Sequence, residues 1–208
     1  MPSNPITVLC VDDHPMIRDG IAFALQSQSD MLLVAEATNG TEAIAAFRKH
    51  RPDVTLMDLQ MPEINGIDTI TAIRKEFAEA RIVVLTTYSG DIQAVRALKA
   101  GAAGYLLKGS LRTELIDTIR RVHAGHRYIP QEVAAGLAEH FNADALSPRE
   151  IDVLRNVSDG CSNKIVADRL AISEDTVKGH MKNIMEKLRA NDRTHAVLIA
   201  LKRGFLDG

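Results

Sequence analysis

The sequence contains no tryptophan, and only 4% of its 208 residues are aromatic. It has two cysteines, Cys10 and Cys161, which lie far apart in segments with the patterns of buried or helical structure. No group of cysteines and histidines has metal-ligand spacing, and two distant cysteines do not suggest a disulfide framework. We therefore expect both cysteines to be reduced side chains packed in the interior, and we exclude a disulfide-stapled scaffold and a zinc module.

Long hydrophobic runs are also absent. No stretch approaches the roughly 18 consecutive apolar residues that a membrane span requires. The first residues, MPSNPITVL, lack the basic-then-apolar order of a signal peptide. We expect a cytoplasmic protein that has no membrane partner.

The sequence also lacks a large excess of charge of either sign. The net charge is −2, with 14 basic against 17 acidic residues in 1–143 and 11 against 10 in 144–208. Neither part is basic enough by itself to indicate a nucleic-acid partner. Apolar residues make up 46% of the chain, which is typical of folded proteins, and at about 150 residues per domain the length suits one large domain or two small ones.

What the first 125 residues do contain is a repeated alternation of short apolar runs and amphipathic stretches of helical period. Unbroken apolar runs are typical of parallel strands that helices bury on both faces. The alternation therefore predicts an α/β fold, a doubly wound (βα)5 parallel sheet of flavodoxin-like type. The five predicted strands are Ile6–Val11, Leu32–Ala35, Val54–Met57, Ile82–Leu85 and Gly104–Leu107.

Helix signals support this division. Pro15 stands just inside a predicted start, Asn39 and Glu42 have the spacing of a capping box, and Gly101 follows a predicted end.

The alternation ends near residue 125, where Pro130 prevents a continuing helix. We divide the chain into a first domain at 1–125, a linker at 126–144 and a small all-α domain at 145–208. Within the linker, Val133, Leu137 and Phe141 recur every four residues and predict a short amphipathic helix.

Polar residues stand at the carboxyl ends of four predicted strands, and parallel strands bring these ends to one edge of the sheet. Taken singly, Asp13 could begin a helix, Thr86 could be a strand residue and Lys108 could be solvated surface. As a set they suit a divalent cation and a phosphoryl group, because clustered carboxylates repel without a cation and Mg²⁺ prefers oxygen ligands. The set is Asp12, Asp13, Asp58, Thr86 and Lys108.

Residues 6–124 resemble a response-regulator receiver domain. The resemblance rests on VDDHP at 11–15, LMDLQMP at 56–62 with Gly66, LTT at 85–87 and GAAGYLLK at 101–108. It implies that Asp58 accepts a phosphoryl group from a sensor histidine kinase. It also implies that Mg²⁺, or another divalent cation such as Mn²⁺, is held by Asp12, Asp13, Asp58 and the main-chain carbonyl of Gln60.

The same resemblance assigns the remaining residues of the site. Lys108 would pair with the phosphoryl oxygens, Thr86 would move toward the phosphate, and Tyr105 would change rotamer to fill the vacated space. Gln60 and Tyr88 would flank the phosphate and tune its hydrolysis. We interpret His14 as a capping or surface residue.

The last 62 residues contain only helix signals. Ser147-Pro-Arg-Glu150 predicts a capping box for a helix that runs to about Ser158. A second helix is expected at Asn163–Leu170, and a third from about Glu174 to Arg189 with Ser173 as N-cap. At about 100° per residue, the third helix has an apolar face and a polar, basic face, a pattern also typical of an ordinary surface helix.

Residues 146–205 resemble the LuxR-type helix-turn-helix domain, through LSPRE at 146–150, NKI at 163–165 and TVKGHMKNI at 176–184. The resemblance implies binding of double-stranded promoter DNA, with the third helix in the major groove and Asp192–Phe205 contributing a homodimer contact. The residues implied in DNA contacts are Lys178, Lys182, Gly179, Asn183, Thr176 and Lys164.

Together the two resemblances identify the chain as a member of the NarL/FixJ type of two-component response regulator, a regulatory DNA-binding protein rather than an enzyme. We weighed two alternatives. An aspartyl-phosphate phosphatase commonly has a second acid two residues after its nucleophile, where this sequence has Gln60. A module that signals only through protein contacts would show no salt-dependent DNA binding.

Overall fold

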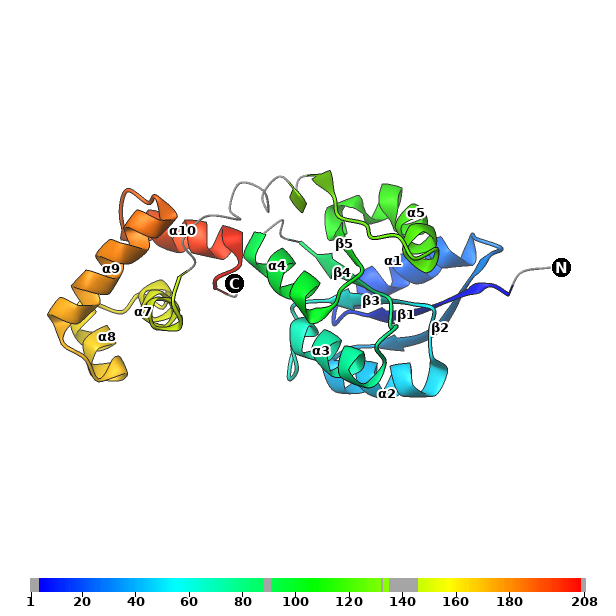
Figure 1. The fold of residues 1–208 in the computed structure, drawn as a ribbon, viewed down its shortest axis with the longest axis horizontal. Helices are drawn as coiled ribbons and strands as arrows, with labels where there is room; N and C mark the ends of the chain where they lie inside the picture. Colours follow the sequence, from blue (N-terminus) through cyan, green and yellow to red (C-terminus); the bar gives the residue numbers. More distant parts are fainter. Residues whose placement is uncertain (1–3, 88–90, 132, 135–145, 207–208) are drawn as a thin grey trace. The chain divides into compact units, whose positions relative to one another are not determined.

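The structure is a computed structural model that describes residues 4–87, 91–131, 133–134 and 146–206 (Figure 1). The chain divides into two compact units, one containing the β-sheet and the other containing the last four helices. Among the described residues, no helix combines the length and the apolar character needed to span a bilayer. Both cysteines are buried and free, as predicted.

The first unit contains a five-stranded, fully parallel sheet with the strand order β2-β1-β3-β4-β5. Strands β3 and β4 are buried at every position, which explains why their sequences are apolar throughout rather than alternating. The doubly wound fold is confirmed. The strands are β1 (Ile6–Val11), β2 (Met31–Ala37), β3 (Val54–Asp58), β4 (Ile82–Thr86) and β5 (Gly104–Leu107).

Helices cover both faces of this sheet. Helices α1 and α5 pack against each other on one face, and α2 and α3 pack together on the other (Figure 1). The helices are α1 (Pro15–Gln26), α2 (Gly40–His50), α3 (Gly66–Glu76), α4 (Asp91–Ala100) and α5 (Leu111–His123), with a short 3-10 turn, η1 (Lys108–Ser110), before α5.

Strand β2 is longer than the predicted Leu32–Ala35, because pairing with β1 continues from Ile6↔Met31 to Val11↔Ala37. Strands β3 and β4 also extend one residue further than predicted. As a result Asp58 and Thr86 are the last residues of their strands, where the backbone of a neighbouring strand fixes their positions.

The predicted helix signals are mostly as expected. Pro15 opens α1, and Gly101 follows α4 with φ of 103°. The capping box at Asn39 is only half formed: its side chain accepts a hydrogen bond from the Glu42 amide, but the Glu42 carboxylate accepts from the backbone and hydroxyl of Thr38 instead of from the backbone amide of Asn39.

The segment after α5 lies along the edge of β5. The amide of Tyr105 donates to the carbonyl of Tyr128 at 2.8 Å, and the amide of Tyr128 donates to the carbonyl of Ala103 at 3.2 Å. The Tyr128 hydroxyl donates to Glu114 of α5 at 2.7 Å. The start of the predicted linker is thus attached to the sheet, whereas Leu137 and Phe141 of its predicted helix lie outside the described residues.

The second unit is helical over its described residues. Its helices are α7 (Pro148–Ser158), α8 (Asn163–Leu170), α9 (Glu174–Leu188) and α10 (Arg193–Arg203). The capping box of Ser147 and Glu150 is formed in both directions, and Ser173 caps α9, both as predicted. Buried side chains from all four helices form one core, which fixes the orientation of α9.

Candidate functional site

Four metal-ligating side chains gather where β1 and β3 end. Candidate ligand atoms of Asp12, Asp13, His14 and Asp58 all lie within 4.8 Å of one another. Strands β1 and β3 are neighbours in the sheet, so Asp12, directly after β1, comes beside Asp58, the last residue of β3. We call this group the acidic pocket. The strand-end argument brought its three aspartates together correctly.

Lys108 crosses to the acidic pocket from the end of β5. Its Nζ lies 2.7 Å from Oδ2 of Asp58 and 2.8 Å from Oδ2 of Asp12. The lysine side chain is only 9% exposed, and both carboxylates are almost fully buried. An ammonium group therefore bridges two acids that would repel each other strongly in a medium of low dielectric.

Burial and pairing act in opposite directions on these groups. Burial raises the pKa of Asp58, and the hydrogen bond and charge of Lys108 compensate only in part, so the net direction is upward. Burial lowers the pKa of Lys108, but hydrogen bonds to Asp12 and Asp58 outweigh it, so the lysine pKa is raised. Lys108 is therefore the fixed positive charge of the site.

The acidic pocket has more acceptor oxygens than donors. Oδ1 of Asp13 is buried without a hydrogen bond of good geometry, although Nδ1 of His14 lies 2.7 Å away. The backbone amide of Gln60 donates to Oδ1 of Asp58 at 3.2 Å. Hard carboxylate oxygens in excess over donors are what a divalent cation requires, and the residues present fit such an ion.

Thr86 and Tyr105 are both buried beside this site, at the end of β4 and within β5. A hydrogen bond links the side chains of these two residues. Burial raises the pKa of Tyr105 to about 12, and this hydrogen bond opposes the rise. The tyrosine thus points inward and is partnered with the threonine.

Sequence reasoning missed two neighbours of the acidic pocket. His14 is a surface residue, one of its two interpretations from the sequence: it stands at the N-cap position of α1 without a side-chain capping bond, and its ring is 64% exposed, but the ring also lies against Asp12 and Asp13, which was not expected. Arg18, one turn into α1, donates to the Asp12 carbonyl at 2.7 Å. The period of α1 could have placed Arg18 over the end of β1. Tyr88 lies outside the described residues.

In the second unit, α9 presents an exposed polar face. The apolar side chains of its other face are buried, with Met185 only partly so, as the periodicity predicted. The exposed residues of α9 include Thr176, Lys178, Gly179, Lys182 and Asn183, and Lys164 is exposed on the preceding helix α8.

Acids accompany the lysines of this face. Lys178 Nζ lies 2.9 Å from Asp175, and Lys182 Nζ lies 4.0 Å from Glu186. The hydrogen bond and charge of Asp175 raise the pKa of Lys178. Because exposed pairs of this kind are weak, both ammonium groups remain available to a phosphate. The Thr176 hydroxyl lies 2.8 Å from Ser173 Oγ, at the helix start.

Comparisons with known proteins extend over both units. A family model described as response regulator receiver domain matches residues 8–120, and one described as bacterial regulatory proteins, luxR family, matches residues 144–200. Transcriptional regulatory protein YxjL of Bacillus subtilis (strain 168) is 36% identical over an alignment of 217 positions that covers 99% of this chain and 100% of the relative.

The nitrate/nitrite response regulator protein NarL of Escherichia coli (strain K12) is 35% identical over 204 positions, with 94% of each chain covered. Among solved structures, RcsB from Salmonella enterica serovar Typhimurium, bound to promoter P1flhDC in the presence of the phosphomimetic BeF3-, is similar with a TM-score of 0.73 and 27% identity over 94% of this chain and 98% of that one. The acidic pocket, the exposed face of α9 and these similarities lead to one conclusion: this chain belongs to the NarL/FixJ-type two-component response regulators, with a receiver domain followed by a LuxR-type DNA-binding domain, and it regulates transcription.

Proposed function

We propose that the partner sensor histidine kinase phosphorylates Asp58, and that this event controls dimerisation and sequence-specific DNA binding by the helical unit. The observation that carries the proposal is the bridge from Lys108 to Asp58 and Asp12, with Asp13 in the same cluster.

We also propose the domain limits 1–125, 126–144 and 145–208. We place the protein in the cytoplasm, with its DNA.

Asp58 supplies the nucleophile. One carboxylate oxygen attacks phosphorus, the bond from phosphorus to the donor histidine nitrogen breaks, and the imidazole leaves with the bonding pair while an acyl phosphate forms. The Nζ of Lys108 already lies 2.7 Å from Oδ2 of Asp58, so it can pair with the phosphoryl oxygens when negative charge passes to them from the carboxylate. The protein thus takes part in its own phosphorylation.

Asp12, Asp13, Asp58 and the main-chain carbonyl of Gln60 would hold Mg²⁺ or Mn²⁺. When bound, this ion would neutralise charge on the transferred phosphoryl group. Lys108 orients Asp12 and Asp58 beforehand, and the Gln60 amide fixes the other oxygen of Asp58.

Thr86 and Tyr105 form the switch. When the Thr86 hydroxyl turns to the phosphoryl group, it gives up its hydrogen bond with Tyr105, and the tyrosine changes rotamer. Moving a two-state equilibrium from 1:99 to 99:1 requires about 5.5 kcal/mol of differential binding, which sets the scale for the contacts of the phosphoryl group.

The kinase would approach over α1 and α5. A cavity of about 440 Å³ lies between these helices, and Lys108 is among its lining residues. Met16 and Phe23 at its border are 85% and 77% exposed. Large exposed apolar side chains around a cavity that Lys108 also lines favour this face for a protein phosphodonor.

The helical unit would place α9 in the major groove. Lys178 and Lys182 would reach guanine edges or phosphates, Asn183 would contact a base edge, and Thr176 and Lys164 would contact the DNA backbone. Gly179, in the middle of this face, would allow close approach of the helix. In a homodimer, two such helices would enter successive major grooves roughly 10 bp apart.

The phosphoacceptor assignment is tested by labelling with acetyl phosphate in the presence of Mg²⁺. We expect Asp58→Asn to abolish labelling, because the amide is no nucleophile for phosphorus, while Asp19→Asn, an exposed acid of α1, leaves it unchanged. Undiminished labelling of Asp58→Asn would overturn the assignment.

The DNA assignment is tested by the salt dependence of binding to a sequence selected from random DNA. Each lost phosphate contact reduces the slope of log K against log[salt] by about 0.9. We expect Lys178→Ala and Lys182→Ala to weaken binding, whereas Arg155→Ala, an exposed cation of α7, does not. Wild-type affinity and slope in both lysine variants would rule out this placement of α9.

A further inference from the structure

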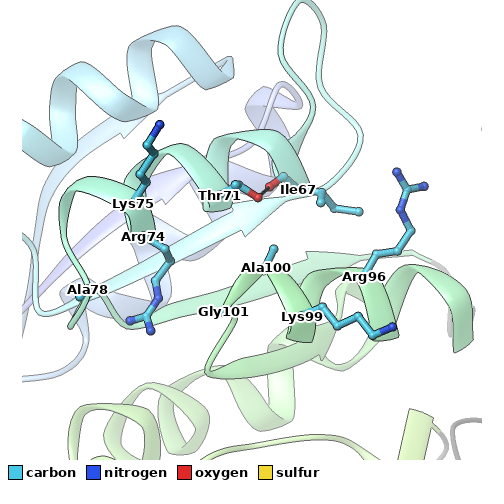
Figure 2. A pocket seen from close by; sticks show the side chains of 9 residues that line it. All are labelled: Ile67, Thr71, Arg74, Lys75, Ala78, Arg96, Lys99, Ala100 and Gly101. Carbon is cyan, nitrogen blue, oxygen red and sulfur yellow. Dashed lines mark hydrogen bonds between the residues drawn. The ribbon is translucent and has the colours of Figure 1, made fainter.

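A groove between α3 and α4 has no role in the function proposed above. It is a shallow, open groove with a volume of about 710 Å³ (Figure 2). Residues of α3 and of the turn after it form one wall, and residues of α4 form the other. The lining residues are Ile67, Thr71, Arg74, Lys75, Ala78, Arg96, Lys99, Ala100 and Gly101.

The charged residues of this α3–α4 groove are all basic. Arg74 and Lys75 belong to the α3 wall, and Arg96 and Lys99 to the α4 wall; no acid is among the described residues that line the groove. None of the four is in an ion pair with another described residue. In a chain with a net charge of −2, this is a local concentration of uncompensated positive charge.

One of these cations is fixed by the fold. Arg74 donates from Nη1 to the carbonyl of Ala80 at 3.0 Å. Its side chain lies against Gly101, where a Cβ would come within 2.7 Å of the Arg74 Nε. Gly101 therefore leaves the room in which Arg74 lies, and this cation is held in place before any ligand arrives.

The four basic side chains do not converge on one point. In Figure 2, Arg74 and Lys75 extend in opposite directions from α3, and Arg96 and Lys99 extend from α4 away from Arg74. Ile67, Ala78 and Ala100 add apolar surface to the lining. A single phosphate could reach only part of this set, whereas an extended anion with several charged groups could contact both walls.

We propose that the α3–α4 groove binds a small anion with at least two linked phosphate groups. Either a nucleoside triphosphate or an inorganic polyphosphate presents this chemistry. The apolar surface would favour the nucleoside form, because a base can cover it. The site is separate from Asp58, so the inference does not depend on phosphorylation of the receiver.

The test is a titration of the isotope-labelled full chain, followed by NMR in EDTA so that no divalent cation takes part. The probes are tripolyphosphate, a nucleoside triphosphate and orthophosphate. We expect the first two to shift the amides of Thr71, Ala100 and Gly101, and to bind at least tenfold more tightly than orthophosphate. Tighter binding of the nucleotide than of tripolyphosphate supports the nucleoside form, and equal binding supports the inorganic form.

Matched charge variants complete the test. Arg96→Gln with Lys99→Gln should weaken binding about tenfold, since two exposed charge contacts are lost. Lys49→Gln with Arg127→Gln removes the same charge from exposed positions outside the groove and should change affinity less than twofold. Equal weakening in both double variants, orthophosphate binding as tight as tripolyphosphate, or shifts confined to α9 would each overturn the proposal.

Discussion

Lys108 is the residue that compensates the negative charge of the acidic pocket. Its ammonium lies within 2.8 Å of carboxylates on two different strands. Removing one partner of a buried ion pair costs about 3–5 kcal/mol, because a charge is left uncompensated. The lysine is therefore a structural counter-charge to Asp12 and Asp58 as well as a group poised for a phosphoryl oxygen.

In the helical unit, Glu150 is likewise a buried charged residue held by an ion pair and a hydrogen bond. It is buried, accepts from the Ser147 amide at 2.7 Å, and pairs with Lys187 at 2.8 Å. Burial raises the pKa of Glu150, but the bonds from Lys187 and Ser147 outweigh it and hold the pKa below the ordinary value of 4.5. A depressed pKa in the folded state contributes stability above the unfolded pKa, and this stability is lost as the pH falls through the folded pKa.

We therefore predict that Glu150→Gln lowers the unfolding free energy of the helical unit at pH 7 by about 1–3 kcal/mol, and that it flattens the loss of stability below pH 4.5. Urea unfolding at several pH values measures both effects. Glu186→Gln, at an exposed pair 4.0 Å long, is the control and should have little effect. The same acid sensitivity in wild type and Glu150→Gln would contradict the account.

At the scale of elements, α3 begins in close contact with the end of β3, next to the site. A Cβ on Gly66, the first residue of α3, would collide with the Asp58 carbonyl and lie 2.7 Å from the Leu59 Cα. These neighbours are backbone atoms and cannot move aside as a flexible side chain could. Glycine at this position lets α3 start directly against the strand that presents Asp58.

Gly66→Ala is accordingly predicted to destabilise the first unit by about 1–3 kcal/mol. Gly20→Ala is the matched control, because Gly20 lies within α1 and, apart from its chain neighbours and the backbone of its own helix, nothing described lies within 4 Å of its Cβ position; there alanine should stabilise by about 0.5–1 kcal/mol. Thermal unfolding distinguishes the two. Equal changes of the same sign in the stability of both variants would show that the close contact at Gly66 does not lower the stability of the alanine variant.

Most elements could be predicted from local sequence because their signals are local. Pro15, Ser147 and Ser173 mark helix starts that the structure has at the same residues. The extra length of β2 could not be predicted, since β1 pairing sets it. The half-formed cap at Asn39 arises because Thr38 competes for the Glu42 carboxylate.

At the scale of the whole molecule, the acidic pocket was predictable because sheet topology alone brings strand ends together. The α3–α4 groove was not, because its basic residues line one groove only through the packing of α3 beside α4, the next helix along the chain. The contacts of His14 and Arg18 with the pocket are local in sequence: His14 contacts its neighbour Asp13, and Arg18, one turn into α1, reaches the carbonyl of Asp12.

The central claim is that phosphorylation of Asp58 governs DNA binding by the helical unit. Its most direct measurement is the affinity of the full chain for a sequence selected from random DNA, at fixed salt, with and without acetyl phosphate and Mg²⁺. We predict that the phosphodonor tightens binding of the wild type by about 5- to 150-fold, the usual range of coupling between two sites, and leaves Asp58→Asn unchanged. Equal affinities of the wild type in both conditions, or equal tightening in Asp58→Asn, would contradict the account.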